Sequence, residues 1–89
     1  MRKFDYTLDN GTKLTVHQPT VRMWYEGYMK AKTDEEVFRS VAEICNRNDE
    51  GISIDADYVR DQFTIDDFKT FASDFPKWVE NIHETDPNS

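Results

Sequence analysis

One segment of the chain has the residue types and spacing of a calcium loop, so metal chemistry is the first possibility to weigh. If Gly51 takes the place of the sharp-turn glycine in an EF-hand, Asn46, Asn48 and Glu50 fall at the first three ligand positions and Asp57 at the last. An EF-hand, however, begins with Asp and ends with a bidentate Glu, and neither is present here. The pattern favours a polar loop between helices, with a calcium-binding module as an alternative.

Zinc binding or nucleophilic chemistry would depend on His17, His83 and Cys45. Two histidines cannot build a zinc site unless Cys45 and a carboxylate join them. Cys45 falls on an apolar helical stripe, which is typical of a small buried side chain rather than of a nucleophile. With 18 acidic residues in the chain, neighbouring carboxylates are expected without any acid–base role. We therefore expect a protein with no catalytic residues, no cofactor and no metal.

The composition describes a small acidic protein that forms one domain over residues 1–89. Its net charge of -7 disfavours contact with the phosphates of nucleic acids. One third of the residues are charged, which excludes a membrane span, and the first residues lack the apolar core of a secretory signal. The single cysteine cannot form an intramolecular disulfide, which fits a reducing cytoplasm.

The elements that must hold any site are a hairpin followed by helices, so the predicted fold class is α+β and mainly helical. Residues 3–8 and 13–17 alternate apolar and polar side chains around an Asn-Gly turn, which predicts a β-hairpin. Apolar periodicity predicts helices over residues 19–31, 34–46, 55–62 and 65–83. Because Pro76 falls inside the last segment, we expect that helix to break there. Residues 84–89 are expected to be disordered.

Two of these helices have capping patterns at their starts. Thr33 and Glu36 have the spacing of a capping box, in which the Thr33 hydroxyl accepts from the Glu36 N–H and the Glu36 carboxylate reaches back to the N-cap. Thr64 and Asp67 repeat the pattern, with Asp in place of the usual Glu. The sequence therefore predicts helix starts just after residues 33 and 64.

Aromatic side chains are abundant for so polar a chain, at 13% of residues. On an ideal α-helix the apolar residues Val21, Trp24, Tyr25, Tyr28 and Met29 would share one stripe. Helical spacing of this kind usually means core, but tyrosine and tryptophan are also the residues most enriched in protein interfaces. We expect at least part of the Trp24/Tyr28 face to contact a partner. The candidate partner-binding residues are Trp24, Tyr25, Tyr28, Phe75 and Trp78.

The order of these signals resembles the tail assembly chaperones of long-tailed bacteriophages. The resemblance covers about residues 4–83 and is one of pattern, carried best by NGTKLTV at residues 10–16, PTVR at 19–22 and TIDDF at 64–68. It implies a small acidic protein of the infected or lysogenic host's cytoplasm that binds the tape measure protein while the tail tube is assembled. The tail tube protein and further copies of the chain are additional candidate partners.

Two other classes of function stay open at this point. An acidic adaptor or host-enzyme inhibitor would use the same surface as a protein-interaction module, although the acids concentrate at helix starts rather than in rows along one face. A calcium-binding module would use the loop after residue 46.

Overall fold

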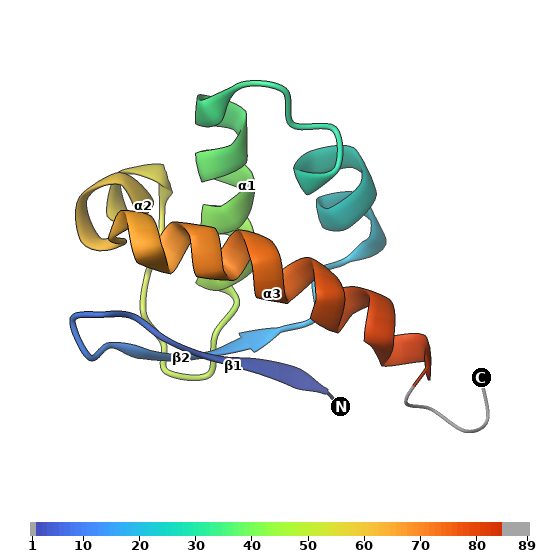
Figure 1. Ribbon diagram of the computed structural model, residues 1–89, viewed down its shortest axis with the longest axis horizontal. Coiled ribbons are helices and arrows are strands. Elements are labelled where there is room, and N and C mark those ends of the chain that lie inside the picture. The colour runs from blue at the N-terminus through green and yellow to red at the C-terminus, as the bar shows by residue number, and fades with distance from the viewer. Residues whose placement is uncertain (1, 85–89) are drawn as a thin grey trace.

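The computed structural model describes residues 2–84, with side chains up to residue 82, and contains an antiparallel hairpin followed by four helices (Figure 1). This confirms the α+β, mainly helical fold class. The elements in chain order are β1 (Lys3–Thr7), β2 (Lys13–His17), the π-helix η1 (Arg22–Tyr28), α1 (Asp34–Asn46), α2 (Ala56–Gln62) and α3 (Ile65–Glu84). Glu84, the first residue of the tail that was expected to be disordered, is instead the last residue of α3. The rest of that tail lies outside the described residues.

The hairpin turn has one residue in the left-handed region of backbone angles, whereas a two-residue Asn-Gly turn would have two. Gly11 has a φ of 90°, while Asn10 keeps a negative φ and accepts a hydrogen bond from the Thr12 N–H through its side chain. The Gly11 N–H donates to the Leu8 carbonyl and the Leu8 N–H donates to the Thr12 carbonyl, each at 2.9 Å. This is a three-residue loop with a glycine bulge, a common hairpin form.

The hairpin register places four apolar side chains on one face of the sheet. Phe4 pairs with Val16 and Tyr6 pairs with Leu14. A two-stranded hairpin is marginal by itself in water, and here this face is covered by α3, which crosses it in Figure 1. Phe71 and Phe75 of α3 are fully buried and stack with ring centroids 4.7 Å apart.

The segment after α1 lies along the free edge of β2, which the sequence did not indicate. The His17 N–H donates to the Arg47 carbonyl at 2.8 Å, and the Asp49 N–H donates to the Thr15 carbonyl at 3.1 Å. Val16 and Asn48 form an isolated antiparallel bridge. The polar loop therefore satisfies the backbone groups at one edge of the sheet.

The expected break at Pro76 is wrong, because α3 runs without interruption from Ile65 to Glu84 (Figure 1). The missing Pro76 N–H would have bonded to the carbonyl of Ala72, which lies on the exposed face of the helix where water can replace it. Phe71 and Phe75 before the proline and Val79 after it all pack against the same core. We conclude that this packing outweighs the cost of the proline, about 3 kcal/mol in a helix interior.

Both predicted N-caps are confirmed, and the one at the start of α3 forms the full reciprocal box. The Thr33 hydroxyl accepts from the Glu36 N–H at 3.2 Å and contacts the Glu36 carboxylate at 3.1 Å. At the start of α3 the Thr64 hydroxyl accepts from the Asp67 N–H, and the Asp67 carboxylate accepts from the Thr64 N–H, both at 3.0 Å.

Asp67 also ties α3 to the hairpin. Its carboxylate accepts from the Asp9 N–H at 2.9 Å, and the Tyr6 hydroxyl donates to its carbonyl. Asp67 is buried, and burial together with the Asp67 charge raises the pKa of Tyr6. One acidic side chain thus completes a cap and holds two distant parts of the chain together.

Candidate functional site

The candidate site is built on η1, and the structure first corrects the type of this helix. The Met29 N–H donates to the Trp24 carbonyl five residues earlier, so the turn is wider than in the α-helix expected over residues 19–31. The Thr20 hydroxyl accepts from the Met23 N–H at 3.1 Å and caps the start. π-Helical turns are rare and occur often at functional sites, which makes η1 the first segment to consider.

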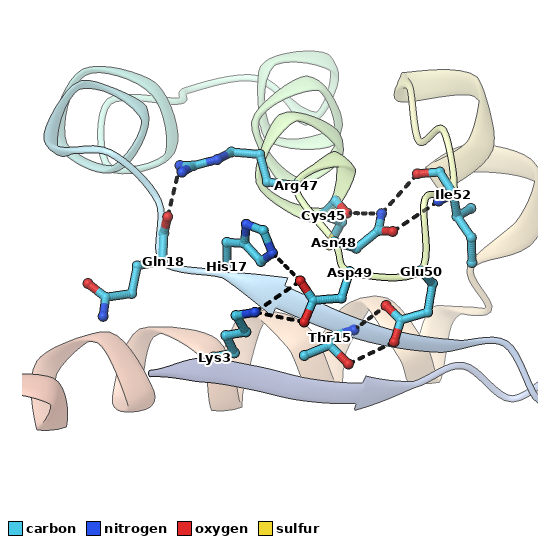
Figure 2. Close-up of polar contacts among 10 residues, drawn as sticks. All are labelled: Lys3, Thr15, His17, Gln18, Cys45, Arg47, Asn48, Asp49, Glu50 and Ile52. Atoms are coloured by element: carbon cyan, nitrogen blue, oxygen red, sulfur yellow. Dashed lines mark hydrogen bonds and ion pairs between the residues drawn. The ribbon is translucent and has the colours of Figure 1, made fainter. Parts of the chain in front are cut away.

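A single arginine from the loop after α1 holds the segment that leads into η1. The Arg47 guanidinium donates to the Gln18 carbonyl at 2.8 Å, as Figure 2 shows, and contacts the Met23 sulfur at 3.5 Å. The position of η1 therefore depends on the loop that covers the edge of β2.

The wider turn divides the expected single apolar stripe into two faces. Residues four apart stay aligned, so Trp24 and Tyr28 face inward. The Trp24 and Tyr28 rings stack with centroids 4.9 Å apart and planes 5° from parallel. Trp24 is only 7% exposed and also packs against Phe75 at 5.8 Å. Tyr28 is half-buried, and burial raises its pKa.

The other face of η1 is exposed and apolar. Val21, Tyr25 and Met29 are 75%, 60% and 59% exposed, and we call these three residues the η1 stripe. Only Ile65 is comparably exposed among the large apolar residues that the structure describes. Apolar residues scattered singly over a surface are normal, but three in line along one helix form a candidate contact surface.

A shallow depression adjoins the η1 stripe and extends it toward the end of α3. Its volume is about 140 Å³, and its walls include Pro19, Val21 and Tyr25 on one side and Val79 and Ile82 of α3 on the other. Trp24 also lines it. The stripe and the depression together form one continuous, mainly apolar surface.

The five predicted partner-binding residues therefore have different places in the structure. Tyr25 belongs to the exposed stripe, and Tyr28 is half-buried beside it. Phe75 has no exposed surface, so it supports the site only from within. Trp78 packs on Phe4 and Phe75 and lines a second small depression of about 120 Å³ near Arg2. The sequence pattern missed Val79 and Ile82 as part of the same surface.

The calcium-like loop has its polar side chains occupied by protein groups (Figure 2). The Asn48 amide donates to the carbonyls of Cys45 and Ile52 at 2.8 and 2.9 Å, and its oxygen accepts from the Ile52 N–H. The Asn46 side chain accepts from the Ile54 N–H at 2.8 Å. Asp57 pairs instead with Arg60, in the helix that follows.

Carboxylates of the same loop bind the outer face of the hairpin. Asp49 lies 2.8 Å from the Lys3 ammonium and 2.5 Å from the His17 ring, and Glu50 accepts from both the N–H and the hydroxyl of Thr15 at 2.7 Å (Figure 2). The hydrogen bonds from Lys3 and His17 lower the pKa of Asp49, and those from Thr15 lower the pKa of Glu50. The described residues contain no group of three or more His, Cys, Asp or Glu side chains placed to hold a metal ion.

Cys45 lies inside the core as the helical pattern predicted. It is fully buried, and burial raises the pKa of its thiol to about 12. A thiol of this kind is neutral near pH 7 and packs as a small apolar group.

In the part of the chain that the structure describes, no helix has the length and apolarity needed to cross a bilayer. Comparison with known proteins gives no family model, no curated protein and no solved structure that matches this sequence.

Proposed function

We propose that this chain is a non-catalytic tail assembly chaperone of a long-tailed bacteriophage that binds the tape measure protein in the host cytoplasm. The observation that carries the proposal is the η1 stripe and its adjoining depression, an apolar surface on a protein with a net charge of -7. The sequence resemblance supplies the identity of the partner.

The physical demands of that role agree with this surface. A tape measure protein is a long helical chain with apolar seams, which would associate with one another if left uncovered. A helix laid along a shallow apolar surface is a common mode of recognition. The small area favours weak contacts, repeated along the partner, which can be displaced as the tail tube grows.

The net charge supports the same role. Acidic proteins repel one another and remain soluble while they cover an apolar partner. The exposed residues Arg22 and Glu26, whose charged groups lie 4.0 Å apart, border the stripe and are available to a partner helix of mixed charge.

The test is co-expression of the full chain with overlapping segments of the tape measure protein encoded by the same phage. We expect at least one segment to form a complex that survives size-exclusion chromatography, and Tyr25→Asp to weaken that complex at least tenfold, about 1.4 kcal/mol, because it places a charge in the apolar contact. Thr70→Asp is the matched control, since it adds the same charge at an exposed position of α3 outside the depression.

The proposal makes two outcomes decisive. If no tape measure segment binds, the chain is not a tape measure chaperone. If a segment binds but Tyr25→Asp and Thr70→Asp affect it equally, the η1 stripe is not the binding surface. In both experiments the melting temperature of each variant shows whether the fold is intact.

A further inference from the structure

A second apolar depression lies at the end of α3 that is far from the η1 stripe. It has a volume of about 300 Å³ and is formed by α1, α2 and the first turns of α3. Its apolar walls are the side chains of Phe38, Val59, Phe63, Ile65 and Phe68. Figure 1 shows α2 and the teal helix η1 toward opposite ends of α3. We call this depression the α2–α3 groove.

A row of uncharged residues on α3 joins the two depressions. Ile65 and Phe68 line the groove, and Val79 lines the depression beside the η1 stripe. Between them, Ala72 is exposed and Pro76 is half-buried. With 3.6 residues per turn and a rise of 1.5 Å per residue, these five residues fall within an arc of about 80° and span about 21 Å. We call them the α3 row.

The charged side chains of the groove leave its apolar walls as the main feature that a partner can recognise. The charged residues that line it are Asp34, Arg60 and Lys69. Glu35 and Asp57 already bind the Arg60 guanidinium, so its charge is balanced within the molecule. Asp34 and Lys69 are exposed and opposite in sign. The groove therefore suits an apolar side chain rather than a strongly charged one.

We propose that one amphipathic helix of the partner lies along the α3 row and covers both depressions. This inference rests on the proposed function, because the occupant is the tape measure segment that binds the η1 stripe. A specific contact buries about 800 Å² on each partner. Three exposed side chains and one shallow depression supply only part of such an area. The α3 row and the groove extend the same surface and supply more of it.

The geometry of the row fixes the chemistry of the bound segment. A partner helix that follows the row over about 21 Å needs about 14 residues, and one further turn brings it to about 18. Its apolar residues recur at i, i+3 or i+4, and i+7, as in other helices that dock in apolar grooves. On a helical wheel the charged residues of α3 nearest the row are Lys69 and Glu80, which are both exposed. Because they lie toward opposite ends, an acidic side chain beside Lys69 and a basic one beside Glu80 set the direction of the partner helix.

The first measurement uses the wild-type full chain and synthetic peptides of about 18 residues from the tape measure segment that co-expression identifies. In two further peptides of the same length, alanine replaces the apolar seam residues of one half or of the other. Alanine preserves the helix, so only the contacts change. We expect each of these peptides to bind at least tenfold more weakly in calorimetric titration, because each reaches only one depression. An alanine peptide that binds as tightly as the parent would overturn the proposal and leave the proposed function intact.

The second measurement uses variants of the chain with the parent peptide. Ala72→Asp places a charge at the middle of the α3 row, and Ile65→Asp places one at the groove. Each should weaken binding at least tenfold. Ile65 is the first residue of α3, where an acidic side chain is compatible with the helix, so this variant keeps its fold even if Ala72→Asp melts early. Thr70→Asp adds the same charge on the opposite side of α3 and should leave binding unchanged.

The variants also separate this proposal from the proposed function. If Tyr25→Asp weakens binding while folded Ile65→Asp and Ala72→Asp bind as Thr70→Asp does, the η1 stripe alone is the binding surface and only this inference fails. If no tape measure segment binds, both proposals fail. Sedimentation of the purified chain tests the remaining occupant. If the chain self-associates, and Ala72→Asp abolishes that association without changing binding of the segment, a second copy and not the partner covers the row.

Discussion

Two regions of the molecule are stabilised in different ways. The first is the contact between the hairpin and the loop after α1, and the second is the helix η1. At the first, polar side chains bind one another in a closed set: Asp49 holds Lys3 and His17, and Glu50 holds Thr15 (Figure 2). At the second, one hydrogen bond from Arg47 fixes the approach to η1, and three apolar residues remain exposed.

This difference separates scaffold from contact surface. Polar groups that already hydrogen-bond to each other gain little from a partner. Exposed apolar area, in contrast, stabilises a complex when a partner covers it. The hairpin and its loop therefore fix the shape of the molecule, and η1 carries the candidate contact surface. The predictions below test whether that division is sound.

The largest effect is expected from comparing the two faces of η1. Trp24→Ala should destabilise the protein by about 3–5 kcal/mol, because it removes a buried ring that packs on Tyr28 and Phe75. Tyr25→Ala, one residue away, should change stability by about 0.5 kcal/mol or less, because its ring is exposed. Urea unfolding of both variants measures the difference. Similar losses at the two positions would show that η1 does not have separate inner and outer faces.

The next effect concerns Asp67, the buried contact between α3 and the hairpin turn. Asp67→Asn keeps one oxygen acceptor but places an N–H₂ group against one of the two N–H groups, those of Asp9 and Thr64, from which the carboxylate accepts. We expect a loss of about 2 kcal/mol, the cost of buried donors left unsatisfied. Asp66→Asn, the exposed neighbour, is the control and should cost little. Equal effects would mean that the negative charge in the first turn of α3, and not the hydrogen bonds of Asp67, accounts for the loss.

A gain in stability of about 1–3 kcal/mol is expected for Pro76→Ala. The change restores a backbone donor inside α3, although the more flexible unfolded chain offsets part of the gain. Thermal unfolding measures it, with Ala72→Ser on the same exposed face as a control for the substitution itself. A destabilised Pro76→Ala variant would indicate that the helix is not continuous there and that the break expected from the sequence is real.

Local signals in the sequence predicted the elements of the fold well. The hairpin around Asn10 and Gly11, the boxes at Thr33 and Thr64, and the four helical segments were each encoded within a few neighbouring residues. The pairing of residues 47–49 with β2 could not be predicted in this way, because it joins segments about 30 residues apart and has no alternating pattern.

Two errors had the same origin, the assumption that every helix is independent and regular. The break at Pro76 ignored the core contacts of Phe71, Phe75 and Val79, which hold both halves of α3 in line. The single stripe on η1 assumed 3.6 residues per turn, whereas the wider π-helical turn aligns residues four apart, so Val21, Tyr25 and Met29 form a row separate from Trp24 and Tyr28. Periodicity identified the aromatic residues of the candidate site, but only the geometry separated those that support the surface from those that form it.

The smallest effect concerns the polar end, where acid should release the loop from the hairpin. Asp49 and Glu50 have lowered pKa values in the folded chain, so their contribution to stability is complete above their ordinary pKa values of 3.8 and 4.5 and is lost as the pH falls through the folded values. Asp49→Asn should lower the melting temperature at pH 7 by a few degrees at most, because the ion pairs are solvent-exposed. The difference from the wild type should shrink as the pH falls below 3.8, the ordinary pKa of Asp49, and through its lowered folded value, since the wild-type Asp49 carboxylate then becomes protonated. A difference that stays constant with pH would mean that the effect of the substitution does not come from the ionised Asp49 carboxylate.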